Sequence, residues 1–198
     1  MKYILLFLAV LIMNACTVVS PHIVEYKLKA VPTDIVSLSK SCPTKSLKLA
    51  QSFSANSLMS QTMKYTQDSF SEYAFSESKW SESPNRAFTQ ELLTSIREAH
   101  IFESVQGFRS RSKTDYILES NIEEFMQYFS ADATHSYVQI RVAFALVDTQ
   151  SAKPLDTVTL SERVEVKDIS AKGGVKAFNE ALSKLLQKSN LWLAKACE

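Results

Sequence analysis

The stretch from residue 138 to residue 146 alternates strictly between large apolar and smaller or polar side chains, and this constrains the fold more than any other segment. Val138, Ile140, Val142, Phe144 and Leu146 alternate with Gln139, Arg141, Ala143 and Ala145. Successive side chains of a β-strand point to opposite faces of a sheet, so the pattern predicts a strand with one buried face. Such a strand needs others to pair with, and the chain offers several.

Shorter alternating segments predict the other strands of this sheet. They lie at about residues 23–28, 47–53, 59–65, 70–76, 116–125 and 158–166. In the segment 47–53 the alternation puts Leu47, Leu49 and Phe53 on one face. Asp148 to Asp156, which contains Pro154, is expected to join the last two strands as a hairpin.

Two segments have helical periodicity instead. Ser83-Pro84 is a typical helix start, and Phe88, Leu92, Ile96 and Ala99 then recur on one helical face. The second helix is expected from about Val175 to Ala194, with Gly173-Gly174 as a turn before it. The order of strands, helix, strands and helix predicts an α+β fold. We expect a largely antiparallel sheet of about six strands with two helices packed on one face.

The N-terminus is typical of a bacterial lipoprotein signal. Lys2 precedes an apolar run from Tyr3 to Met13, which is too short to span a bilayer comfortably, and Ala15 stands directly before Cys16. We expect residues 1–15 to be removed and Cys16 to carry three acyl chains, which would anchor the protein stably. A signal anchor with an incidental cysteine is the alternative. Thr17, in place of an aspartate, favours the outer membrane.

The expected division of the mature chain follows from this cleavage. Residues 16–45 would form the lipidated cysteine and a spacer that includes one edge strand, and residues 46–198 a single α+β periplasmic domain. Removal of Lys2 leaves 22 − 1 = 21 basic against 21 acidic residues. A neutral chain lacks the basic surface that nucleic acid requires, so no nucleic-acid partner is expected.

Two cysteines remain after Cys16. Cys42 and Cys197 flank the predicted domain, and in an oxidising periplasm they can form a disulfide bond that joins its two ends. Two unrelated free thiols are the alternative.

The sequence contains no arrangement of residues that indicates catalysis. His22, His100 and His135 are scattered, without the spacing of a metal site. Glu123-Glu124 is a carboxylate pair, but adjacent strand residues point to opposite faces, so the two are not expected to act together. We therefore expect a non-enzymatic protein without metal or cofactor.

Two groups of side chains could form contact surfaces. Arg109, Arg111 and Lys113 lie in one predicted loop, which could bind an anion or could simply be solvated. Aromatic residues form two groups, which could be sheet core or an apolar surface for a partner protein or a lipid chain. These groups are Phe70, Tyr73, Phe75 and Trp80, and Phe125, Tyr128 and Phe129.

One stretch of the chain resembles the ABC-type transport auxiliary lipoprotein family. It contains Tyr73-Ala74-Phe75, Trp80, Pro84, the helical segment Phe88 to Leu93 and the ending Ile101-Phe102-Glu103-Ser104-Val105. The strand that starts at Asp115-Tyr116 and the early Tyr26-Lys27-Leu28 fit the same pattern. The resemblance covers about residue 26 to the C-terminus.

This resemblance implies a non-enzymatic lipoprotein at the outer membrane, facing the periplasm. Such proteins work with an ABC transporter and an MCE-domain protein that move lipids between the two membranes. The family supplies no catalytic residues, so Cys16 is the one firmly assigned site residue. A lipoprotein subunit of another envelope machine, such as lipopolysaccharide assembly or a secretion apparatus, is the alternative.

Overall fold

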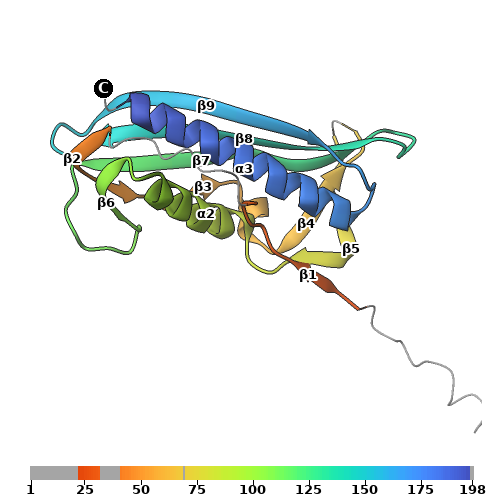
Figure 1. The fold of residues 1–198 in the computed structure, drawn as a ribbon. Coiled ribbons are helices and arrows are strands. Elements are labelled where there is room, and N and C mark those ends of the chain that lie inside the picture. Colours follow the sequence, from red (N-terminus) through yellow and green to blue (C-terminus); the bar gives the residue numbers. More distant parts are fainter. Residues whose placement is uncertain (1–21, 32–40, 69, 197–198) are drawn as a thin grey trace, which may run out of the picture.

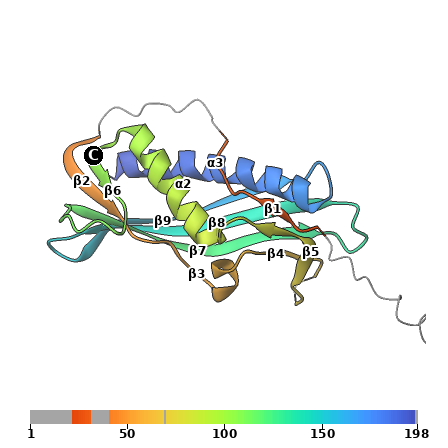
Figure 2. The same ribbon diagram turned by 90° about the horizontal axis from the view of Figure 1, so that it is seen from below.

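The computed structural model describes residues 22–31, 41–68 and 70–196. Within these ranges the chain forms a nine-stranded sheet with both α-helices on one side of it (Figures 1 and 2). The elements are β1 (Val24–Tyr26), β2 (Cys42–Leu49), β3 (Phe53–Ser54), the 3-10 helix η1 (Asn56–Met59), β4 (Thr62–Thr66), β5 (Tyr73–Trp80), α2 (Pro84–Ala99), β6 (Phe102–Gln106), β7 (Tyr116–Phe129), β8 (Ser136–Asp148), β9 (Lys153–Glu165) and α3 (Ala171–Lys195).

Strand β7 organises the sheet. One edge of β7 pairs antiparallel with β8 from end to end, and β8 pairs in the same way with β9. The other edge is shared by β2, β3 and β4, which pair with β7 one after another and all in parallel. Strand β6 adds to β2, while β5 and then β1 add beyond β4.

The α+β class and the two helices on one face agree with the sequence prediction, but the expected largely antiparallel sheet of about six strands is wrong. The sheet is mixed. After the β4–β5 hairpin the chain returns through α2 and β6 to the start of β7, so β7 runs in the same direction as β2, β3 and β4. Alternation shows which residues share a face but not in which direction neighbouring strands run, so it could not reveal this topology.

One hydrophobic core lies between the sheet and the helices. The apolar positions of α2 that periodicity predicted are buried, as are all five large apolar residues of the alternating run in β8. Helix α3 contributes Phe178, Leu182 and Leu185 to the same core. Each such side chain adds about 1.5–3 kcal/mol when it leaves water. Neither helix in the described part of the chain has the length and apolar character needed to cross a bilayer.

The strand predicted over residues 47–53 is interrupted between β2 and β3. Contrary to the prediction, Phe53 therefore does not share the buried face of Leu47 and Leu49. Leu47 and Leu49 are buried, but Phe53 is 66% exposed and Ser52 is buried. The backbone N–H of Ser52 donates to Thr89 Oγ1 at 3.1 Å, and the hydroxyls of Ser52 and Ser120 are 2.7 Å apart. These bonds hold a break between β2 and β3 that reverses the alternation. Met59, expected in a strand, lies in η1 instead.

Helix α3 begins at Ala171, four residues earlier than predicted. Gly173-Gly174 therefore lies inside the first turn of the helix and does not form a turn before it. The side chain of Ser170 caps the helix by accepting a hydrogen bond from the Gly173 N–H at 3.0 Å. Both glycines stand where neighbouring atoms leave no room for a Cβ. Their role is thus close packing.

Residues 28–31, which follow β1, pack against the core and form hydrogen bonds with both helices. After β1, Leu28 is buried. The next three backbone N–H groups donate to side chains of the helices. The N–H of Lys29 donates to Asn179 Oδ1 at 3.0 Å. The N–H of Ala30 donates to Glu91 Oε2 at 2.9 Å, and that of Val31 donates to Ser183 Oγ at 2.8 Å.

Candidate functional site

Of the predicted site residues, only Cys42 lies among the described residues; Cys16 and Cys197 fall outside them. Cys42 is buried at the start of β2, where it pairs with Phe102 of β6. Helix α3 ends close to β2 and β6 in both views (Figures 1 and 2). The bond between Cys42 and Cys197 and the lipidation of Cys16 remain predictions.

The three histidines are separated in the fold. His22 precedes β1, His100 ends α2 in the left-handed conformation and His135 lies in the turn between β7 and β8. Among residues 22–31, 41–68 and 70–196, no cluster of His, Cys, Asp and Glu side chains could hold a metal ion.

Glu123 and Glu124 do meet, contrary to the prediction that they point apart. The register of β7 against β8 shifts between Ile122 and Glu124, which marks a bulge, and a bulge turns one side chain out of the alternation. Arg141 Nε lies 3.3 Å from Glu123 Oε2, and Arg141 Nη2 lies 2.9 Å from Glu124 Oε2. Both carboxylates thus bind the same guanidinium group.

Two tyrosine rings and a second arginine extend this ion pair along the sheet face opposite the helices. The Tyr128 hydroxyl donates to Glu124 Oε1 at 2.7 Å, the Tyr128 ring stacks on Tyr137 and the Arg163 guanidinium lies 3.5 Å from the centre of the Tyr137 ring. Burial, and then the bond to Glu124, raise the pKa of Tyr128 well above its usual range. The tyrosine therefore keeps its proton to a higher pH than a free tyrosine does, and the arrangement is suited to stabilising the sheet.

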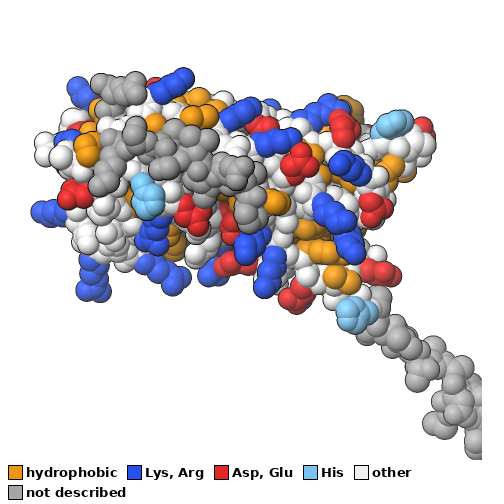
Figure 3. Space-filling view, viewed as in Figure 1, with side chains coloured by type: hydrophobic (Ala, Val, Ile, Leu, Met, Phe, Trp, Pro, Cys, Tyr) orange, Lys and Arg blue, Asp and Glu red, His pale blue; other side chains and the backbone are white. Residues whose placement is uncertain are grey.

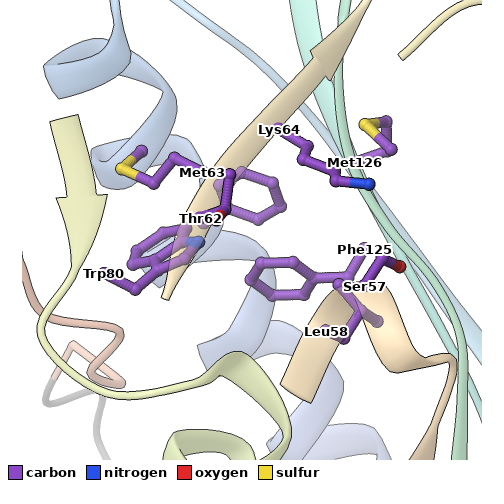
Figure 4. A pocket seen from close by; sticks show the side chains of 9 residues that line it. Ser57, Leu58, Thr62, Met63, Lys64, Trp80, Phe125 and Met126 are labelled. Atoms are coloured by element: carbon purple, nitrogen blue, oxygen red, sulfur yellow. The ribbon is translucent and has the colours of Figure 1, made fainter. Parts of the chain in front are cut away.

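The pocket in Figure 4 lies between η1, β4, β5, β7 and α3. It is lined by Ser57, Leu58, Thr62, Met63, Lys64, Trp80, Phe125, Met126 and Phe178. Its volume of about 20 Å³ has room for one water molecule but none for a lipid chain. The Trp80, Phe125 and Phe178 rings pack around it with centres 4.3 to 5.8 Å apart. Trp80 and Phe125 therefore belong to the core, one of the two alternatives for the aromatic groups.

A larger hollow lies on the open sheet face. It has a volume of about 590 Å³, within the range of ligand and partner sites, and includes the exposed ring of Phe53. Small side chains of β8 and β9 form its floor, namely Ala143, Ala145, Thr157 and Thr159. Because α2 and α3 both lie on the other side of the sheet, the hollow is a candidate contact surface for a protein partner.

Arg109, one of the three cations in the predicted loop, lines two surface hollows. Leu49, Leu93 and Phe108 line an apolar hollow of about 200 Å³ beside α2. Arg109 borders this hollow and a neighbouring one of about 100 Å³, which Arg86 also lines. Arg111 and Lys113 do not line either hollow. These two hollows therefore do not bring the three cations together.

A second aromatic cluster lies at the end of the sheet where β4 and β7 finish. Tyr65 contacts Tyr73, Phe75 and Phe129, with ring centres 4.7 to 5.4 Å apart. These rings are not fully buried, and Phe70, in the adjoining hairpin, is 98% exposed. This group is therefore not buried core throughout, and its use as a contact surface stays a prediction. The sequence could not separate this cluster from the core cluster, because both lie in alternating strands of similar composition.

Solved structures with a similar fold include protein XCC0632 from Xanthomonas campestris, assigned to family DUF330. It has a TM-score of 0.77 and 13% identity, over 87% of this chain and 96% of that chain. An uncharacterized protein has a TM-score of 0.63 and 10% identity, over 88% of this chain and 100% of its own. PelC from Paraburkholderia phytofirmans, a dodecamer, has a TM-score of 0.50 and 12% identity, over 78% and 91% of the two chains. At these identities the likeness shows the fold alone.

None of the curated proteins matches the chain. Residues 26–188 match the model of one protein family, described as the ABC-type transport auxiliary lipoprotein component. The match includes every strand from β2 to β9, all of α2 and most of α3, and it agrees with the resemblance seen in the sequence. The chain therefore belongs to the family of ABC-type transport auxiliary lipoproteins.

Proposed function

We propose that this protein is a non-enzymatic accessory subunit of an ABC transport system that works with an MCE-domain protein to move lipids between the two membranes. Cys16 carries its lipid anchor, which holds the folded domain at the outer membrane on the periplasmic side. Membership of the auxiliary lipoprotein family is the observation that carries the proposal. The signal sequence that ends at Cys16 supports the anchor.

The described cavities favour a contact role over a carrier role in this system. The pocket beside Trp80 has room for one water molecule and is too small for an acyl chain. The apolar hollow beside α2 and the hollow around Phe53 are both open to the surface and do not enclose a chain. We infer that lipid passes through the partner proteins and that this subunit binds and positions one of them.

Affinity purification of the tagged full-length protein from gently solubilised envelopes tests the proposal. We expect an MCE-domain protein and the ABC transporter to be recovered with it. Recovery of lipopolysaccharide assembly or secretion components in their place would support the alternative envelope machine and contradict the lipid transport role. Phe53→Asp, an exposed substitution in the open hollow, should reduce recovery of the partner if that hollow is the contact surface.

The anchor is tested separately. Cys16→Ala should abolish labelling by a radioactive fatty acid and should release the protein from the membrane fraction or leave it unprocessed. A Cys16→Ala protein that is still cleaved and still sediments with outer membranes would contradict the lipidation. Cys42→Ala is the matched control, because it removes a thiol outside the signal sequence and should leave labelling unchanged.

A further inference from the structure

The aromatic hairpin between β4 and β5 ends in a side chain that nothing in the described fold covers. Phe70 is 98% exposed, whereas a phenylalanine of a folded protein usually lies inside. Hydrogen bonds of described neighbours hold the backbone of Phe70 and of the next residue. Asp68 Oδ1 accepts the backbone N–H of Phe70 at 2.7 Å and that of Ser71 at 2.6 Å, and the Thr66 hydroxyl donates to the Ser71 carbonyl at 2.7 Å.

Further exposed apolar side chains belong to the same end of the sheet. Tyr73, at the start of β5, is 42% exposed and stacks on Tyr65. Ile169 is also exposed. The carbonyl of the next residue, Ser170, accepts a hydrogen bond from Gln127 of β7. Gln127 pairs with Tyr65, which places Ile169 at this end of the sheet. We call Phe70, Tyr73 and Ile169 the apolar tip.

The described chain begins at the same end of the sheet as the apolar tip. Strand β1 pairs in parallel with Ser78 to Trp80, the last residues of β5, and Figures 1 and 2 place β1 and β5 at the end of the sheet opposite β2 and β6. Ile23 and Val24 are exposed on the approach to β1. Figure 3 shows apolar side chains gathered over β1 and β5, beside the point where the described chain begins.

The length of the approach decides which part of the molecule meets a membrane. Six residues lie between Cys16 and Ile23, and the seven Cα–Cα steps that join these two residues span at most about 25 Å when the chain is fully extended. Strand β8 alone, with 13 residues, is about 44 Å long. An anchor at Cys16 can therefore hold the hairpin end of the sheet at the bilayer surface. The tether is too short for the opposite end of the sheet to rest on the bilayer while the hairpin end is turned away from it.

One charged pair and one carboxylate lie near the apolar tip. Lys64 Nζ lies 2.6 Å from Glu72 Oε2. The Asp68 carboxylate accepts backbone hydrogen bonds from Phe70 and Ser71 and keeps its negative charge. A contact with lipid would rest on the apolar and aromatic side chains, since aromatic residues favour the membrane interface.

We propose that the apolar tip is a membrane-contact site, in which Phe70 inserts into the interfacial region of the lipid leaflet that holds the anchor. The inference rests on the lipid anchor of the proposed function. The tether keeps the tip next to the bilayer, so a weak insertion is enough to fix the orientation of the domain. The open sheet face and its hollow are then held at a constant angle to the membrane.

Short-range quenching by lipids tests this site. The full-length lipidated Phe70→Trp variant is reconstituted into phosphatidylcholine vesicles, either plain or brominated on the acyl chains. We expect the brominated vesicles to remove more than half of the emission that the introduced tryptophan adds over wild type. Leu155→Trp is the matched control, since Leu155 is half exposed at the opposite end of the sheet, and its added emission should remain.

Flotation of the same vesicles separates the possible failures. A protein that does not float with the vesicles contradicts the anchor itself and with it the proposed function. A protein that floats while position 70 escapes quenching, or while positions 70 and 155 are quenched alike, overturns the membrane-contact site alone. Quenching that is unchanged by high salt supports an apolar contact; its loss in salt would contradict one. Equal thermal unfolding of both variants and wild type shows that neither substitution disturbs the fold.

Discussion

Gly173 lies so close to the carbonyl oxygen of Asp168 that a Cβ on this glycine would stand 1.7 Å from that oxygen. At Gly174 a Cβ would stand 2.0 Å from Oε1 of Gln127. Gln127 is fully buried and donates to Ser136 Oγ at 3.0 Å. The first turn of α3 can thus pack on β7 and on the loop before it only if both positions lack a side chain.

Gly173→Ala should lower the free energy of unfolding by about 1–3 kcal/mol, because the backbone of Asp168 must move to admit the methyl group. Gly174→Ala should cost less, since the atom it meets is the end of a side chain. Urea denaturation measures both. Gly107→Ala is the control, because its Cβ would meet Leu93 at an ordinary 3.4 Å. A stabilised Gly173→Ala variant, following helix propensity alone, would contradict the packing argument.

Tyr128 should make the protein sensitive to alkali. Burial and Glu124 raise its pKa in the folded state, so above about pH 10 the unfolded chain loses a proton that the folded protein keeps. The stability from this group is complete below pH 10 and falls as the pH rises. The decline should be at most about 1 kcal/mol per pH unit after solvent screening.

Urea midpoints of wild type and Tyr128→Phe between pH 8 and pH 11 measure this decline. The variant should lose stability more slowly above pH 10, because the remaining tyrosines titrate in both proteins. Parallel curves for the two proteins would show that Tyr128 does not retain its proton in the folded state.

Ser46 and Asp115 should contribute stability that acid removes. The Ser46 hydroxyl and N–H donate to Asp115 Oδ2 at 2.6 and 2.8 Å, and these two bonds lower the pKa of the Asp115 carboxyl. A lowered pKa stabilises the fold above the unfolded value of about 3.9, and this contribution is lost as the pH falls through the lower folded value.

Ser46→Ala should cost about 1 kcal/mol at pH 7 and less at pH 2. In an Asp115→Asn background the same substitution should cost less at neutral pH, which a double-mutant cycle measures. An equal cost in both backgrounds would show that the serine acts through some other contact.

Cys42 and Cys197 should be joined by a disulfide bond in protein purified from the periplasm. Alkylation of the denatured, unreduced protein should then leave its mass unchanged, whereas reduction first should add two alkyl groups. The bridge would close a loop of 197 − 42 = 155 residues and stabilise the fold by about 4–5 kcal/mol in the chain-entropy model. Cys42→Ser and the double Cys42→Ser/Cys197→Ser variant should therefore unfold at the same, lower temperature. Alkylation without reduction would disprove the bridge.

Local patterns predicted those parts of the fold that depend on one buried face. Both the helix that starts at Pro84 and the long strand β8 bury the residues that periodicity selects. The parallel return of β2, β3 and β4 along β7 was not predictable in this way, because strand direction depends on how the whole chain is connected.

The failures at single residues share a cause as well. Phe53 turns outward because Ser52 bonds to Thr89 and Ser120, which are distant in the sequence. Glu123 and Glu124 meet because a bulge in β7 brings both to Arg141 of the next strand. The exposure of Phe70 likewise depends on tertiary placement, since its hydrophobicity alone favours the core. The family pattern, by contrast, is local and was available from the residues alone.

The bonds of residues 29–31 to the two helices have a mechanical consequence. A pull on the N-terminal side of the chain reaches β1 first, and β1 is an edge strand of only three residues. The load then passes to Leu28 and to the hydrogen bonds with Asn179, Glu91 and Ser183, which spread it over α2 and α3. The fold thus resists tension through its helical layer, and the sheet that carries the open hollow keeps its shape under load.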